Sequence, residues 1–147
     1  MRGYLLDTNV IAMTAPANAA RDQTVLDWLE AHTDVLFLSV VTIAEIERGI
    51  ALAACKDARR NAASLAAWLE AVLHLYGRRV LSMDIPVAQA AGRLDASARN
   101  LGLAPGFANI AMAATAVAHD LTVLTRNVRH FRPLGLTVLD PFNEPLP

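Results

Sequence analysis

The sequence predicts one α/β domain, in which helices cover both faces of a mostly parallel sheet of about five short strands. Short apolar segments alternate along the chain with segments whose apolar residues recur at helical spacing. The 147 residues, 54% of them hydrophobic, are enough for one core without a second lobe. Low aromatic content and the Ala-rich run at 108–118 favour helices packed closely on a sheet. We expect the domain to span residues 1–140, with a proline-rich tail at 141–147.

Each element follows from a local pattern. Apolar or β-branched runs predict strands at residues 4–6, 35–38, 80–83, 122–125 and 137–139. Helical spacing of apolar residues predicts helices at residues 21–32, 42–54, 65–76, 86–102 and 109–119. The Thr42-x-x-Glu45 pattern is typical of a capping box, Gly77 suits a helix end, and Pro86 suits a first helical turn. Strands that alternate with helices in this way favour parallel pairing.

Composition and charge restrict the function. The formal net charge of −1 gives no global attraction for nucleic acid, so any RNA contact must be local. The single cysteine, Cys55, cannot form an internal disulfide and is consistent with a reducing compartment. The first apolar run stops at Asp7, too early for a signal peptide, and no later run approaches the roughly 20 residues of a membrane span. We expect a soluble cytoplasmic protein that does not contact membranes.

Four polar residues follow predicted strands or begin a helix: Asp7, Glu45, Asn109 and Asn127. Because ligand sites of parallel sheets lie beyond the carboxyl ends of the strands, all four could face one cleft. Carboxylates that converge there would repel one another unless they share a hard divalent cation such as Mg²⁺. Each residue also has a purely structural explanation. Asp7 could cap a short helix, Glu45 could complete the capping box, and the asparagines could be cap or turn residues.

Other chemistries find little support in the sequence. It contains no Gly-rich phosphate loop ending in Gly-Lys and no Gly-x-Ser-x-Gly elbow. The four histidines lack zinc-ligand spacing, and solvated or core positions explain them better. A phosphatase that used Asp7 as its nucleophile would want a second acid at position 9, where Asn9 stands.

Three segments in order carry a family resemblance: Leu5-Leu6-Asp7-Thr8-Asn9-Val10, residues 39–49 and residues 110–127. They resemble the successive motifs of PIN domains, specifically the VapC toxins of bacterial toxin-antitoxin pairs, and the match covers nearly the whole chain. The resemblance implies a PIN-like fold and a Mg²⁺- or Mn²⁺-dependent endoribonuclease that hydrolyses RNA phosphodiesters with metal-activated water.

The resemblance also implies roles for single residues. Asp7 falls on the first metal-binding acid, Glu45 on the second, and Asn109 on a metal-binding position where Asp is usual. Asn127 occupies a position that is Asp or Asn, and the supporting polar residues are Thr8, Asn9, Ser39, Thr42 and Thr125. Since an amide brings no charge, Asn109 should lower metal affinity. We keep three explanations open: a natural weakening, an engineered knockout, or a nearby acid such as Asp84 or Asp95 that completes the site.

The densest basic segment follows the fourth predicted strand and contains Arg126, Arg129, His130 and Arg132. Arg126 and Arg129 are our candidates for the RNA backbone, with a solvated loop as the alternative. Arg48, one helical turn beyond Glu45, could instead pair with that acid.

Partners also follow from the resemblance. It implies a homodimer and a VapB-like antitoxin whose disordered tail folds into a groove and covers the site. Promoter DNA would be bound only through that antitoxin. Two hypotheses therefore remain, an RNA-cleaving toxin and a catalytically weakened or inactive PIN-fold module that acts through an antitoxin and DNA complex.

Overall fold

The computed structural model describes residues 2–16, 18, 21–56 and 58–147. Its sheet has five strands, all paired in parallel, in the order β3-β2-β1-β4-β5. Their bounds are β1 Tyr4–Leu6, β2 Leu36–Ser39, β3 Val80–Leu81, β4 Thr122–Leu124 and β5 Val138–Leu139. The predicted α/β fold and its parallel sheet are confirmed.

The central strand, β1, separates the early strands from the late ones. It pairs with β2 on one side, Leu5 opposite Phe37, and with β4 on the other, Leu6 opposite Leu124. The chain first adds β2 and β3 outward on one side and later adds β4 and β5 on the other. The strand order therefore reverses between β1 and β4. Ligands of open parallel sheets bind at such a point, beyond the carboxyl ends of the strands.

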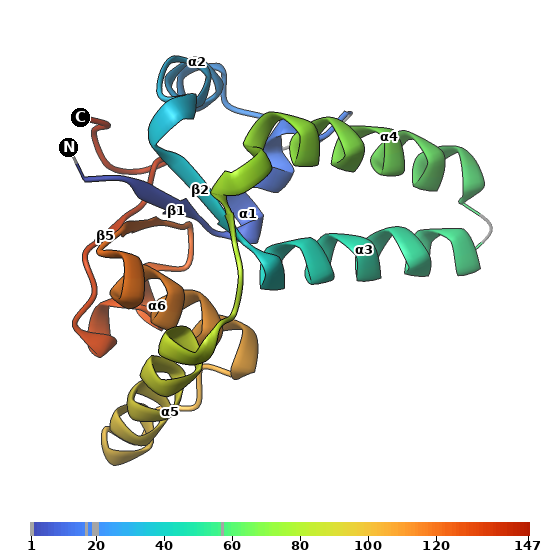
Figure 1. Cartoon of the computed structure of the whole chain (residues 1–147). Helices are drawn as coiled ribbons and strands as arrows, with labels where there is room; N and C mark the ends of the chain where they lie inside the picture. The colour runs from blue at the N-terminus through green and yellow to red at the C-terminus, as the bar shows by residue number, and fades with distance from the viewer. Residues whose placement is uncertain (1, 17, 19–20, 57) are drawn as a thin grey trace.

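Helices cover both faces of the sheet (Figure 1). Their bounds are α1 Thr8–Ile11, α2 Gln23–Ala31, α3 Val40–Cys55, α4 Arg59–Tyr76, α5 Ile85–Asn100 and α6 Phe107–His119. Leu6 and Leu124 belong to a core formed with α1 to α4, while Leu5 and Val123 pack against α6. Side chains of a strand alternate between faces, so both faces of these short strands are buried. None of the helices that the structure describes is both long and apolar enough to cross a membrane.

Three helices start two or more residues earlier than the sequence predicts. Helix α4 begins at Arg59 rather than at residue 65, because residues 59–64 contain no large apolar side chain whose spacing could indicate its first turns. Helix α3 begins at Val40, because Ser39 is the N-cap and its Oγ accepts a hydrogen bond from the Val41 amide at 3.0 Å. The predicted capping box is therefore wrong, and Thr42 is buried inside the helix. Helix α6 begins at Phe107, after Gly106 at φ +86°. A positive φ suits glycine, so the chain turns into α6 before Asn109.

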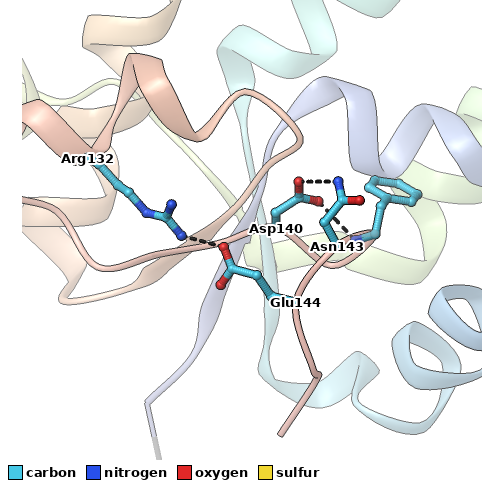
Figure 2. A network of polar contacts seen from close by, with 5 residues as sticks. Arg132, Asp140, Asn143 and Glu144 are labelled. Atoms are coloured by element: carbon cyan, nitrogen blue, oxygen red, sulfur yellow. Dashed lines mark hydrogen bonds and ion pairs between the residues drawn. The ribbon is translucent and has the colours of Figure 1, made fainter.

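The C-terminal segment contains no helix or strand after β5, yet it is tied to the domain. Figure 2 shows that Asn143 donates to Asp140 and that Arg132 and Glu144 form an ion pair. The indole of Trp28, in α2, donates to the carbonyl of the last residue at 3.0 Å. These contacts hold the end of the chain against β5 and α2.

Candidate functional site

Asp7 is the first residue after β1 and lies at the reversal of strand order. Its backbone amide donates to the Leu124 carbonyl at 2.9 Å, so the residue is held between β1 and β4. The residue is only 7% exposed, and its two carboxylate oxygens have different partners. Oδ1 accepts from the Thr8 amide at 2.8 Å and caps α1, while Oδ2 accepts from the Thr125 hydroxyl at 2.7 Å. Capping therefore occupies one oxygen and leaves the other in a polar network.

Besides Thr8, two of the predicted supporting residues contact Asp7 directly through their side chains, Asn9 and Thr125. The buried Thr125 hydroxyl accepts from the Asn127 amide at 2.9 Å, so its own hydrogen points to Asp7. Asn9 Nδ2 lies 3.4 Å from Asp7 Oδ2, and Asn9 Oδ1 accepts from the Arg126 amide at 3.2 Å. These contacts join the ends of β1 and β4 and fix the direction of the Asp7 carboxylate.

Glu45 reaches the same network from α3. Its side chain is exposed, and Oε1 accepts from the Thr8 hydroxyl at 2.7 Å. The Thr8 hydroxyl also lies 3.3 Å from that of Thr42. Thr8 thus joins the two acids, because its amide binds Asp7 and its hydroxyl binds Glu45. The predicted alternative of a pair with Arg48 is wrong, since no ion pair between Arg48 and Glu45 exists in the described part of the chain.

The charges around Asp7 and Glu45 favour a bound cation. Among the described residues, no Lys or Arg lies within ion-pair distance of Asp7 or Glu45, and Glu45 Oε2 has no hydrogen-bond partner. Two neighbouring carboxylates without a counter-charge repel each other. No group of three or more metal-ligating His, Cys, Asp or Glu side chains occurs in the ranges described. The donors that are present, the two carboxylates of Asp7 and Glu45, fit a hard ion such as Mg²⁺, which binds one or two carboxylates and keeps several waters.

Asn109 lies in the first turn of α6 and makes other contacts. Its Nδ2 donates to the Pro105 carbonyl at 2.7 Å and lies 3.0 Å from His130 Nδ1. Helix α6 meets the acidic network one turn later, where Met112 Sδ lies 3.5 Å from the Thr42 hydroxyl. Asn109 therefore lies one helical turn before the contact between α6 and Thr42, without a hydrogen bond to either acid, and its metal-binding role remains a prediction.

The remaining predicted site residues make no hydrogen bond to Asp7 or Glu45 through their side chains in the described part of the chain. Ser39 is buried and caps α3, while the side chain of Asn127 is exposed. The guanidinium of Arg126 lies 3.9 Å from the centre of the Phe142 ring, and Arg129, three residues later, is exposed.

Neither acid considered as a substitute joins the network. Asp84 caps α5 by accepting from the Val87 amide at 3.1 Å. Asp95 pairs with Arg99 at 3.0 Å on the exposed side of α5. The charge of the site therefore comes from Asp7 and Glu45.

Sequence reasoning missed two contacts. The contact between Asn109 and His130 joins residues 21 positions apart, and no periodic pattern relates them. Phe142 was predicted only as part of the tail, whereas it supports Arg126. The one signal for His130 was its place in the basic segment after the fourth strand.

Comparisons with known proteins identify the family and agree with the fold. The PIN domain family matches residues 4–134. The chain is 39% identical to a plasmid stability protein, StbB of Pseudomonas syringae pv. tomato, over 94% of this chain and 97% of that protein. It is 35% identical to the VapC ribonuclease Y4jK of Sinorhizobium fredii, over 94% and 96% of the two chains.

A solved structure shares the fold over nearly its full length. FitAcB of Neisseria gonorrhoeae superposes with a TM-score of 0.85 at 32% identity, and the alignment covers 96% of this chain and 99% of that one. Together with the family match over residues 4–134, these likenesses show that the chain belongs to the PIN domain family.

Proposed function

We propose that this protein is a divalent-metal-dependent endoribonuclease and the toxin of a VapBC-type toxin-antitoxin pair. One observation carries the proposal: Thr8 joins two carboxylates that lack a counter-charge, at the reversal of strand order. The relative named VapC ribonuclease supports the same activity.

The acidic residues supply the charge of the proposed site. Asp7 and Glu45 would hold Mg²⁺ or Mn²⁺, and Asn109 Oδ1 would be an uncharged ligand. When bound, the ion would activate a water molecule and stabilise negative charge on the phosphate. Thr125 and Asn9 orient Asp7, and Thr8 keeps the two carboxylates close to each other. The Asn127 amide helps to fix the Thr125 hydroxyl.

RNA would approach from the basic segment that follows β4. Arg126 is fixed at both ends, because its amide binds Asn9 and its guanidinium packs on Phe142. A guanidinium held over an aromatic ring still presents N–H donors at its edges, which suit phosphate oxygens. Arg129 is exposed and adds a second cation. These charges act locally in a protein whose formal net charge is −1.

The partners that we propose come from the family. A VapB-like antitoxin would bind this chain and cover the site, and promoter DNA would be bound through the antitoxin rather than by the toxin. We also propose a homodimer in the cytoplasm. The likeness to FitAcB over almost the whole chain supports an assembly of this type.

A second function has one observation in its favour. The site contains two carboxylates, and the position where a third is usual in the family holds Asn109. A PIN-fold module with little or no catalytic activity, which acts through the antitoxin and DNA complex, would tolerate this loss. It would bind its partner normally without cutting RNA.

Asp7→Asn separates the two functions. The amide can still cap α1, so the fold should persist while the negative charge is lost. We expect cleavage of a labelled RNA with Mn²⁺ to fall about a hundredfold or more, because transition-state charge loses its support. Asp84→Asn is the matched control, since Asp84 caps α5 outside the site. Equal cleavage by the wild type and Asp7→Asn, or none by the antitoxin-free wild type, would contradict the nuclease.

A further inference from the structure

The contacts of Asn109 fix the orientation of its amide group. The Pro105 carbonyl, 2.7 Å away, can only accept a hydrogen bond, so the atom that faces it must be the amide nitrogen. That nitrogen carries two hydrogens, and the second is directed to His130 Nδ1 at 3.0 Å. The Asn109 nitrogen therefore donates to the histidine.

This contact determines what His130 offers to a ligand. If Nδ1 accepts from Asn109, a neutral imidazole carries its proton on Nε2. Among the described residues Nε2 has no hydrogen-bond partner, and the side chain is partly exposed. His130 thus presents an N–H donor. Because Nδ1 is occupied and Nε2 is protonated, neither nitrogen has a free lone pair for a metal ion.

Hydrogen bonds also place His130 close to the acidic centre. The His130 amide donates to the Asn127 carbonyl at 3.1 Å, and the Asn127 amide donates to the Thr125 hydroxyl at 2.9 Å. That hydroxyl in turn donates to Asp7 Oδ2 at 2.7 Å. The backbone that carries His130 is therefore anchored to Asp7, and the exposed Arg129 precedes it directly.

We propose that His130 binds a phosphate oxygen of the RNA substrate through Nε2–H, and that Asn109 is the residue that positions it. The inference rests on the proposed nuclease function and deepens it. Asn109, which stands where the family usually has an acid, would then favour binding of the anionic substrate. Its amide donates to Nδ1 and so keeps the proton of His130 on Nε2, the nitrogen that faces away from Asn109. A carboxylate at position 109 would instead accept from Nδ1 and draw the proton inward.

RNA binding without metal gives the first test. A short fluorescein-labelled RNA of randomised sequence is titrated in EDTA, so that cleavage cannot intervene. We expect His130→Phe to weaken binding about tenfold, the effect of one hydrogen bond to a charged group. His130→Gln, which can present an amide N–H near the Nε2 position, should retain most of the affinity. His119→Phe, at the far end of α6, is the control.

Metal affinity and tautomer complete the test. We expect His130→Phe to leave the calorimetric affinity for Mn²⁺ unchanged, whereas a metal-ligand role would lower it. Nitrogen-15 spectra of the imidazole in alkaline buffer should show the proton on Nε2 in the wild type and on Nδ1 in Asn109→Asp. Unchanged RNA binding in His130→Phe, or a wild-type proton on Nδ1, would overturn the inference. Weakened RNA binding in a protein that never cleaves RNA would overturn only the proposed function.

Discussion

The two sides of the site differ in the chemistry that they offer. The side formed by β1, α1 and α3 contains Asp7 and Glu45, surrounded by hydroxyl and amide donors and joined through Thr8. The side formed by α6 and the segment after β4 contains no carboxylate of the family set. It presents Asn109, His130 and arginine side chains. The acidic side suits a cation, and the opposite side suits an anion.

In the proposed nuclease, this difference would let the site keep its function without a third acid. In the usual family pattern an acid at position 109 would add negative charge to the metal site. Here the Asn109 amide donates a hydrogen bond to His130, so the side of the site formed by α6 carries no negative charge from residue 109. We therefore expect weaker metal binding together with better tolerance of the RNA backbone. Four substitutions test this division between an acidic and a basic side.

Glu45→Gln removes half of the charge of the acidic side. Glutamine can still accept from Thr8, so the geometry is kept while the attraction for a cation falls. We expect RNA cleavage with Mn²⁺ to fall by about ten- to a hundredfold. Glu47→Gln, on an exposed part of the same helix, is the matched control. If both variants cleaved as well as the wild type, Glu45 would have no part in the site.

Asn109→Asp makes the two sides more alike. A third carboxylate near Asp7 and Glu45 should raise the Mn²⁺ affinity measured by calorimetry about tenfold, because ligand charge strengthens divalent sites. Asn100→Asp, at the exposed end of α5, controls for the change in net charge. An unchanged affinity would place residue 109 outside the metal site.

Thr125→Val tests the support of the acidic side. The substitution removes the buried hydroxyl that donates to Asp7 Oδ2, and it should lower the free energy of unfolding by about 1–3 kcal/mol. We also expect cleavage to fall about tenfold, as when other residues that orient metal ligands are removed. Thr122→Val, on β4 but outside the network, should change cleavage little, and denaturant unfolding gives the stability of both variants. Full activity in Thr125→Val would contradict a role in orienting Asp7.

Phe142→Leu tests the basic side. It removes the ring under Arg126 without changing any charge, and an exposed cation–π contact contributes about 0.5–1 kcal/mol. RNA affinity in EDTA should therefore fall about two- to fivefold. Phe107→Leu, an exposed phenylalanine at the start of α6, should have no such effect. Identical RNA affinities for the two variants would show that Arg126 needs no support from the C-terminal segment.

The sequence predicted well whatever depends on local pattern. The strand at residues 4–6, the acid that follows it and the alternation of strands and helices all rest on short-range hydrophobic spacing. The capping box failed because Ser39, three residues before Thr42, satisfies the helix start first. The partners of Asn109 and Arg126 depend on how distant segments pack, and no local pattern encodes such contacts.

The central claim, that Asp7 and Glu45 form a divalent metal site, is tested most directly by calorimetric titration of Mn²⁺ into the antitoxin-free protein. We expect measurable binding by the wild type and by Asp84→Asn, and loss of binding in Asp7→Asn. Equal Mn²⁺ binding by the wild type and Asp7→Asn would contradict the claim, because the metal would then be held elsewhere.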